Sequence, residues 1–198
     1  MPAIPLFIVG CEVYYTLLMY GGPDGEASAA FRYMSQKFTF KNPGVAGLLN
    51  DIACEELSHL EIVGTIVHQL VKDLPCDEVD TAGFEKYYVD HTLGVWPQSA
   101  GGVPFTATEF QSSGDPIADL VEDMAAEQKA RKTYDNILSL VKDCEVADPI
   151  KFLRKREIVH FQRFGEALRM VTEEMDKKNF YAVNPSSCIK RYKLIFKL

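Results

Sequence analysis

A Glu-x-x-His motif that occurs twice constrains this chain more than any other feature of its sequence. The first copy runs from Glu56 to His59 and the second from Glu157 to His160. Each copy lies inside an apolar run with the period of an α-helix, and residues three apart share one face of a helix. Each motif should therefore direct a carboxylate and an imidazole from one helix face into an apolar interior.

Two further glutamates give the motifs a common setting. Glu26 lies thirty positions before Glu56, and Glu127 lies thirty positions before Glu157. This equal spacing predicts two helical hairpins with the same layout, in which each glutamate faces its motif across two antiparallel helices. Packed together, the hairpins would gather four carboxylates and two imidazoles, which is the arrangement of ferritin-like bundles that hold two metal ions.

Turn and capping signals predict four helices. A turn rich in Gly and Pro at residues 21–26 precedes the first helix, and the second covers about residues 45–71. The third should begin at Asp115-Pro116 and the fourth at Asp148-Pro149. In both, an aspartate can act as N-cap and a proline can occupy the first helical position.

Between about residues 73 and 114 the helical period fades into a segment rich in Gly, Pro, Thr and Ser. A connection this long needs a reason, and a crossover between two hairpins supplies one, because a bundle with parallel neighbours must carry the chain back along its length. The predicted fold is all-α, a ferritin-like four-helix bundle with a long crossover between helices 2 and 3. We expect a single domain over residues 1–198, with a core of about 20–178. Its ends, 1–19 and 179–198, are atypical and are candidates for poor order.

Composition and charge exclude several classes of function. The chain has 198 residues, a net charge of -7 and five cysteines. The acidic balance argues against a nucleic-acid binder, and scattered cysteines without a C-x-x-C pair indicate a reducing compartment. The apolar start, from Ile4 to Tyr20, contains Glu12, is short for a membrane span and lacks the basic residues of a signal peptide. We therefore expect neither a membrane protein nor a secreted one.

The Glu-x-x-His motif can also be explained without a metal site. A lone histidine on an apolar helix face is more often a core residue that bonds the backbone, and a glutamate three residues before it can be a simple ion-pair partner. The second copy of the motif and the two preceding glutamates favour a metal site, because buried ionisable groups are costly unless they are paired or bound to metal. Carboxylates with imidazoles suit manganese, iron or zinc.

Three other residues have alternative roles. Tyr33 shares the helix face of Glu26 and either donates a hydrogen bond into the site or fills the core. Arg131, one turn after Glu127, either fixes a carboxylate or is an exposed charge. Glu55 falls off the apolar stripe and is expected to be solvated.

Several stretches around these residues closely resemble the manganese catalase family, in its CotJC-type spore coat branch. They are Tyr20–Glu26, Glu55–Glu61, Gly101–Phe105, Gly114–Leu120, Asp123–Arg131 and Glu157–Phe164. The connecting segments agree as well as the candidate ligands, and the resemblance covers about residues 20–175.

The resemblance implies an enzyme that holds two manganese ions and disproportionates hydrogen peroxide to water and dioxygen. By position, Glu26, Glu56 and His59 would bind one ion, and Glu127 and His160 the other. Glu56 would bridge the ions, with Glu127 as a candidate second bridge. Glu157 would lie just outside the ligands and move protons, and Tyr33 matches a tyrosine beside the ligands; both are expected to serve catalysis.

The resemblance also implies a homo-oligomer, found in the spore coat or the mother-cell cytoplasm of an endospore-forming bacterium. Hydrogen peroxide and other spore coat proteins are the expected partners, without nucleic acid or membrane. Two alternatives stay open. One is a di-iron oxidase or peroxidase of the ferritin-like class, because iron accepts the same ligands. The other is a mainly structural coat protein, in which the bundle serves assembly.

Overall fold

The computed structural model describes residues 6–75 and 96–177, and within them the chain is helical. The α-helices are α1 (Leu6–Gly21), α2 (Glu26–Gln36), α3 (Pro43–Val71), α5 (Pro116–Leu140) and α6 (Cys144–Lys177), and the short 3-10 helices are η1 (Lys37–Thr39) and η3 (Ala107–Glu109). In these parts of the chain, strand pairing is limited to one isolated bridge between Gln98 and Pro104. The all-α prediction is confirmed.

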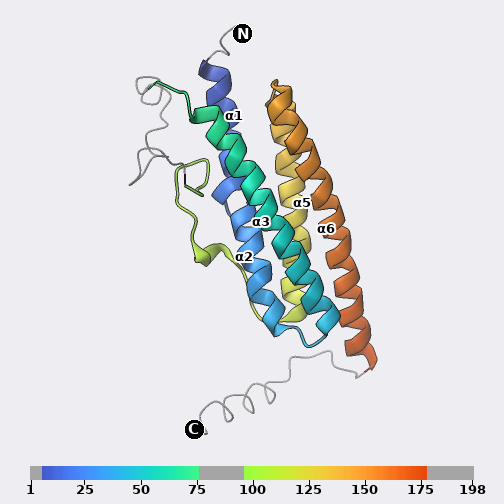
Figure 1. Ribbon diagram of the computed structural model, residues 1–198. Helices are drawn as coiled ribbons and strands as arrows, with labels where there is room; N and C mark the ends of the chain where they lie inside the picture. The colour runs from blue at the N-terminus through green and yellow to red at the C-terminus, as the bar shows by residue number, and fades with distance from the viewer. Residues whose placement is uncertain (1–5, 76–95, 178–198) are drawn as a thin grey trace, which may run out of the picture.

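The α-helices form a bundle of four members, in which α1 and α2 together make one member (Figure 1). α1 and α2 run in the same direction, and α3 returns antiparallel beside them. α5 runs parallel to α3, and α6 returns antiparallel along α5. The described part of the crossover, residues 96–115, passes back along the outside of α2 to the end of the bundle where α5 begins. This is the predicted crossover between helices 2 and 3.

The starts of α3 and α5 follow from their capping residues. Asn42 caps α3 and Asp115 caps α5, and each side chain accepts hydrogen bonds from two backbone N–H groups of the first turn. A proline occupies the beginning of both helices, where no intrahelical partner for its missing N–H is needed. The predicted start at Asp115-Pro116 is therefore confirmed, and the second predicted helix, 45–71, begins only slightly earlier than expected.

The predicted start of the fourth helix at Asp148-Pro149 is wrong. α6 begins at Cys144, and Pro149 lies inside it. Asp143 accounts for the earlier start, because its side chain accepts the backbone N–H of Glu145 at 2.8 Å and so caps the helix. Pro149 therefore lies in the second turn of α6, where its missing N–H removes one intrahelical hydrogen bond.

A short turn separates α1 from α2, and its shape depends on glycine. A side chain on Gly21 would place its Cβ 2.1 Å from the backbone nitrogen of Gln98 in the crossover. A side chain on Gly22 would place its Cβ 2.4 Å from the carbonyl oxygen of Leu18. Only glycine lets the end of α1 and the crossover approach each other this closely.

The segment before this turn, expected to be an atypical end, is helical from Leu6 onward. Val13 and Leu17 of α1 are buried in an apolar cluster with Val67 and Val71 of α3. α1 therefore lengthens the bundle beyond α2. The other predicted atypical end, 179–198, lies outside the described residues.

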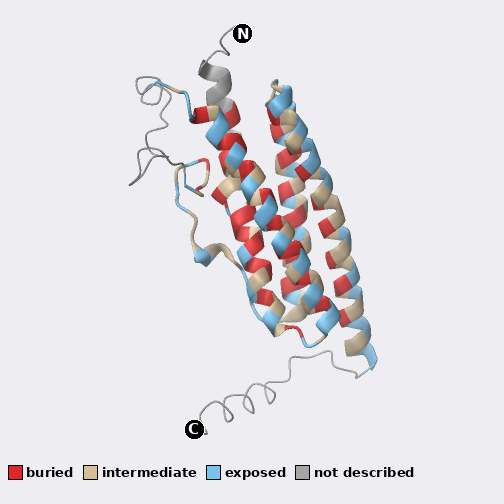
Figure 2. Cartoon of the chain, viewed as in Figure 1, coloured by how far each residue is buried: buried red, intermediate tan, exposed pale blue. Residues whose placement is uncertain are grey.

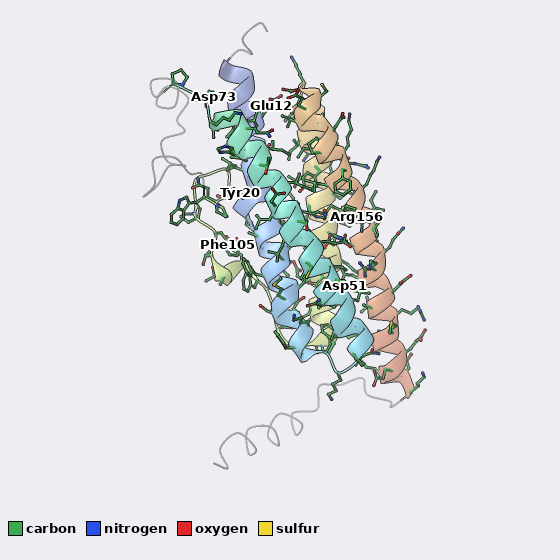
Figure 3. All side chains as sticks on the ribbon, viewed as in Figure 1. Glu12, Tyr20, Asp51, Asp73, Phe105 and Arg156 are labelled. Carbon is green, nitrogen blue, oxygen red and sulfur yellow. The ribbon has the colours of Figure 1, made fainter. Side chains whose placement is uncertain are left out.

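Aromatic side chains hold the crossover against α2. The ring of Phe31 on α2 stacks on Phe105 and Phe110, with centroids 5.9 and 6.2 Å apart. Figure 3 shows Phe105 beside α2. This packing holds residues 105–110 of the crossover against the middle of α2.

Buried residues line the faces that the helices turn toward one another (Figure 2). The two largest apolar clusters contain Leu49 and Phe164 in one and Val63 and Leu153 in the other. Both Glu-x-x-His motifs fall between these clusters along α3 and α6, so their polar side chains are enclosed by apolar packing on both sides. No described helix combines the length and apolar character needed to cross a membrane.

Candidate metal centre

The structure brings all the predicted metal ligands and Glu157 into one buried cluster. α2 supplies Glu26, α3 supplies Glu56 and His59, α5 supplies Glu127, and α6 supplies Glu157 and His160. None of these residues is more than 3% exposed. One ligand atom from each of the four motif residues lies within 4.8 Å of the others. The doubled motif therefore forms a single centre in the middle of the bundle.

Glu56 lies between the two histidines and presents one carboxylate oxygen to each. Nδ1 of His59 lies 2.8 Å from Oε2 of Glu56, and Nδ1 of His160 lies 2.7 Å from Oε1. The imidazole rings stack with centroids 5.4 Å apart and 21° between their planes. Both histidines thus turn the same ring nitrogen toward the centre, and Glu56 has the position of a bridge.

The two preceding glutamates flank this arrangement, one at each histidine. Oε2 of Glu26 lies 3.7 Å from Nδ1 of His59, and Oε2 of Glu127 lies 3.5 Å from Nδ1 of His160. Oε1 of Glu157 lies 3.8 Å from Nδ1 of His59. Each hairpin therefore brings its own glutamate and its own histidine together, as the equal spacing predicts.

Two buried tyrosines connect the hairpins across the centre. Tyr33 of α2 donates a hydrogen bond of 2.5 Å from its hydroxyl to Oε1 of Glu127 on α5. Tyr134 of α5 donates in return to Oε1 of Glu26 on α2. Of the two roles open to Tyr33, the structure shows both, because its hydroxyl bonds to Glu127 while its ring packs in the apolar core against Phe164, with centroids 4.8 Å apart. Tyr134 was missed in the sequence, although it follows Glu127 at the same distance as Tyr33 follows Glu26.

Glu55 contacts Nε2 of His160, the ring nitrogen that faces away from the centre. Its Oε2 lies 2.9 Å from Nε2 of His160 and accepts a hydrogen bond of 2.7 Å from Arg156, which lies on α6 beside α3 (Figure 3). The expectation that Glu55 is simply solvated is therefore wrong. A carboxylate at Nε2 keeps the ring proton there and leaves Nδ1 free to bind a metal ion.

Arg131 makes its hydrogen bonds away from the centre. It donates to Gln128 at 3.0 Å and to Asp135 at 2.8 Å, and Asp135 also pairs with Arg154 of α6. Of its two predicted roles, Arg131 takes the one near the surface, where it helps to join α5 to α6.

The protonation states of the centre are set by its own charges. Burial alone would lower the pKa of each histidine, but contacts with Glu26 and Glu56 raise the pKa of His59 to about 10. Contacts with Glu127 and Glu56 likewise raise the pKa of His160 to about 11. Burial opposes ionisation of Glu56, yet its contacts with both histidines hold its pKa below the ordinary value. Positive charges thus face the carboxylates at neutral pH, and metal ions can replace them once the protons leave.

Glu26 and Glu157 have the opposite character. Burial and the nearby charge of Glu56 raise the pKa of Glu26 to about 8, although contact with His59 opposes the shift. Burial, followed by the charges of Glu127, Glu56 and Glu26, raises the pKa of Glu157 well above its ordinary value. Burial therefore favours the protonated form of both carboxyl groups in the metal-free protein.

The donor set fits two divalent metal ions. Four atoms at the centre are buried and make no hydrogen bond of good geometry within the described residues: Oε1 of Glu56, Oε2 of Glu127, Oε1 of Glu157 and Nδ1 of His160. Two of them, Nδ1 of His160 and Oε1 of Glu56, lie 2.7 Å apart without the alignment of a hydrogen bond. Buried polar atoms that lack a well-aligned hydrogen bond are rare in proteins, and these four converge on one place. Carboxylate oxygens together with imidazole nitrogens are ligands that manganese and iron accept.

Comparison with known proteins agrees with this geometry. Residues 14–186 match the family of manganese containing catalases. The chain is 47% identical to protein CotJC of Bacillus subtilis over 84% of its own length and 88% of that protein. It is 37% identical to a probable manganese catalase of Clostridium acetobutylicum, over 84% of its own length and 75% of that protein.

Solved structures give the same result. The manganese catalase KatB from Anabaena superposes with a TM-score of 0.74 and 33% identity, over 82% of this chain and 73% of that one. A dodecameric thioferritin from Bacteroides fragilis superposes with a TM-score of 0.57 and 16% identity, over 90% of this chain and 94% of that one, which confirms the ferritin-like fold. The chain therefore belongs to the manganese catalase family, in its CotJC-type branch.

Proposed function

We propose that this protein is a dimanganese catalase, which disproportionates hydrogen peroxide to water and dioxygen. The observation that carries the proposal is the position of Glu56, with one oxygen 2.8 Å from Nδ1 of His59 and the other 2.7 Å from Nδ1 of His160. A carboxylate placed in this way between two imidazoles is suited to bridge two metal ions. Membership of the manganese catalase family favours manganese over iron.

The proposed ligands form one set for each ion. Glu26, Glu56 and His59 would hold the first ion, Glu127 and His160 would hold the second, and Glu56 would be shared. Bound manganese would supply the redox chemistry, because it can alternate between divalent and trivalent states. The hydroxyl groups of Tyr33 and Tyr134 fix Glu127 and Glu26, so that the carboxylates stay aligned when the charge at the centre changes.

Glu157 is the proposed proton carrier. Its carboxyl is buried, has a pKa that burial raises well above the ordinary value, and leaves Oε1 without a hydrogen-bond partner among the described residues. Reduction of peroxide to water consumes protons, and oxidation of peroxide to dioxygen releases them. A carboxyl that changes its protonation state beside the reacting molecule serves both halves of the reaction.

The test is oxygen evolution from hydrogen peroxide by protein expressed with manganese, together with elemental analysis of the same sample. We expect oxygen release and about two manganese ions per chain, the metal content of the bundles that share this ligand set. Protein that holds two metal ions but consumes ferrous iron with dioxygen or peroxide, and releases no oxygen, would instead be the di-iron oxidase or peroxidase.

We also propose that the protein is a homo-oligomeric component of the spore coat. Its similarity to protein CotJC supports this location, and exposed apolar side chains such as Phe38 (81% exposed) and Phe152 (51%) offer surface for assembly. Light scattering in solution tests the oligomer, and antibody labelling of spores tests the location. If Glu157→Gln removed oxygen release but left coat assembly and the peroxide resistance of spores unchanged, the mainly structural role would be favoured.

A further inference from the structure

A second cluster of buried polar side chains lies outside the set of proposed metal ligands. It consists of Arg32 and Gln36 on α2 and Asp123 on α5, and none of the three is more than 1% exposed. Nε and Nη1 of Arg32, both polar side-chain atoms of Gln36 and both carboxyl oxygens of Asp123 make no hydrogen bond of good geometry within the described residues. Buried polar groups in this state are rare in proteins. The cluster therefore needs an explanation of its own.

The cluster continues a contact that begins at the candidate metal centre. Tyr33 of α2 donates its hydrogen bond to Glu127 of α5. Gln36 lies three residues after Tyr33, and Asp123 lies four residues before Glu127. Residues three and four apart share one helix face, and α2 and α5 run in opposite directions. Gln36 and Asp123 therefore meet one helical turn further along the same interface.

The corresponding contact between the hairpins has no such turn. Tyr134 of α5 donates to Glu26 of α2, but Ile137 lies three residues after Tyr134 and Gly22 lies four residues before Glu26. An apolar side chain and a glycine cannot hold a proton. The second polar pair thus belongs to one half of the centre, the half that contains Glu127.

The surroundings of Asp123 support both the protonated and the ionised form of its carboxyl. Burial raises the pKa of Asp123 well above its ordinary value, and the charges of Glu127 and Asp119 add to the shift. Contact with Gln36 and the positive charge of Arg32 act against it. Burial therefore favours the proton, while a cation and an amide are already in place to stabilise the carboxylate.

Gln36 and Arg32 suit a carboxyl that changes its state. The amide of Gln36 has both a donor and an acceptor, so it can donate to the carboxylate or, after rotation, accept the O–H of the carboxylic acid. Arg32 keeps its charge in either case. Its Nη2 is held by the carbonyl oxygens of Pro23 and Glu109, at 3.4 Å each, which leaves Nε and Nη1 free for Asp123.

The charge of Asp123 also acts on the candidate metal centre. Burial, followed by the charges of Glu127 and Asp123, raises the pKa of Tyr33 well above its ordinary value. The hydroxyl of Tyr33 in turn lies 2.5 Å from Glu127, a proposed metal ligand. A carboxyl that influences this pair must respond to it as well, because interacting groups shift each other's proton affinity by the same amount.

We propose that Asp123 is a second proton-holding carboxyl of this protein, with Gln36 and Arg32 as the residues that stabilise its two states. Reduction of one peroxide molecule to two water molecules consumes two protons and two electrons, and oxidation of a second peroxide molecule to dioxygen returns both. Glu157 accounts for one proton and Asp123 for the other. Asp123 releases its proton when oxidation raises the charge of the centre, and regains it on reduction. The inference rests on the proposed catalase function.

The first test counts protons in the manganese-loaded protein. Electrochemical reduction of the oxidised centre in weakly buffered solution, with a pH indicator, measures proton uptake. We expect about two protons per two electrons for the wild type and about one for Asp123→Asn, which keeps the shape of the side chain but cannot take up a proton. Asp119→Asn is the matched control. Asp119 is also buried on α5, but it accepts three hydrogen bonds from Ser113 and Gly114 that hold it ionised, so its loss should leave the count unchanged.

The second test uses the metal-free protein at neutral pH. The infrared carbonyl band of protonated carboxyl groups should lose part of its intensity in Asp123→Asn and keep it in Asp119→Asn. Arg32→Met, which removes the compensating charge, should keep the band but lower the proton count to that of Asp123→Asn. If Asp123 were only a structural partner of Arg32, Asp123→Asn would lower the melting temperature and leave both the band and the proton count unchanged. That result would overturn the inference.

These outcomes separate the two proposals. A proton count that falls in Asp123→Asn, in a protein that releases no oxygen, would support the proton-holding role of Asp123 and overturn the catalase function. Oxygen release by a protein whose proton count and infrared band are the same in Asp123→Asn and the wild type would support the catalase and overturn the role of Asp123.

Discussion

The two hairpins carry the same motif at the same spacing, yet the two motif glutamates differ in their chemistry. In the first hairpin Glu56 lies between both histidines, and its pKa is lowered. In the second hairpin Glu157 approaches only His59, at 3.8 Å, and burial with the neighbouring carboxylates raises its pKa well above the ordinary value. Equal positions in a repeat therefore do not give equal protonation. The charges that each side chain meets across the bundle account for the difference, which agrees with the roles we propose for Glu56 as a bridge and Glu157 as a proton carrier.

The histidines differ as well. Nε2 of His160 is held by Glu55, whereas the ring of His59 meets the edge of Phe152 at 6.3 Å between centroids and 87° between planes. One imidazole is thus oriented by a charged network between α3 and α6, and the other has an aromatic neighbour. We expect the two proposed metal ions to differ in affinity for this reason.

The largest expected effect is a difference in metal binding between variants of the two motif glutamates, Glu56 and Glu157. Glu56→Gln should abolish the binding of both metal ions and all oxygen release, because the shared carboxylate is lost. Glu157→Gln should keep both ions and lower kcat by a factor of about 10²–10⁴, the usual contribution of a general acid or base. Elemental analysis and oxygen evolution on both variants measure the difference. If Glu157→Gln also lost its metal, Glu157 would be a ligand and the contrast between the hairpins would disappear.

The second prediction concerns the network at His160. Glu55→Ala should weaken the binding of one of the two metal ions by about 10–100-fold, as the loss of a carboxylate behind a metal-binding histidine commonly does. Glu61→Ala, an exposed glutamate on the same helix, is the control and should have no effect. Titration against a competing chelator resolves the two binding steps. Equal weakening of both steps would show that His59 and His160 do not differ in the way their surroundings indicate.

The third prediction concerns a property that the hairpins share. The pKa values of His59 and His160 are raised from 6.5 to about 10 and about 11, so the folded metal-free protein binds more protons than the unfolded chain from pH 6.5 upward. The free energy of unfolding should therefore fall as the pH rises from 6.5 to about 10. Glu26, with its pKa raised from 4.5 to about 8, acts in the same direction.

Urea denaturation across this pH range, with and without manganese, measures the effect. Manganese-loaded protein should not lose stability in this way, because the metal has already displaced the protons. A metal-free protein that gains stability from neutral to alkaline pH would contradict the proton-binding centre described here.

Some features of the candidate site could be predicted from the sequence, and others could not. The helical period and the equal spacing predict which face of each helix is buried, and Glu26, Glu56 and His59 do converge with the second hairpin. The bond from Glu55 to His160 could not be predicted, because it depends on how α3 and α6 are rotated against each other. The period of a single helix says nothing about that rotation, and Glu55 falls off the buried stripe of its own helix.

The contact between the crossover and the turn after α1 was equally hidden from the sequence. The crossover packs against Gly21, where no larger residue would fit. A run rich in glycine predicts a turn, but it does not show which other segment will approach it. Tyr134 is different, because the repeat that revealed the motifs also contains it. Comparing the hairpins position by position would have predicted its role from that of Tyr33.

The smallest expected effect concerns the two tyrosines, each of which donates a hydrogen bond to a glutamate of the other hairpin. Tyr33→Phe leaves Oε1 of Glu127 without its donor, and Tyr134→Phe does the same to Oε1 of Glu26. Each variant should lower the free energy of unfolding of the metal-free protein by about 1–3 kcal/mol, the cost of leaving one buried polar group unpaired. Tyr20→Phe, a change outside the centre, is the control for loss of a hydroxyl, and chemical denaturation measures all three.

The double variant with both Tyr33→Phe and Tyr134→Phe tests whether the two hydrogen bonds are coupled. Because the two tyrosines hold different glutamates, their effects should add if the flanking carboxylates act independently, and should depart from additivity if the centre responds as one unit. Strongly unequal single effects would mean that the symmetry of the spacing ends at the motifs, and that only one tyrosine supports the proposed metal site. Equal and coupled effects would mean that the hairpins hold each other's ligands in place, so that neither half of the repeat could form its part of the centre alone.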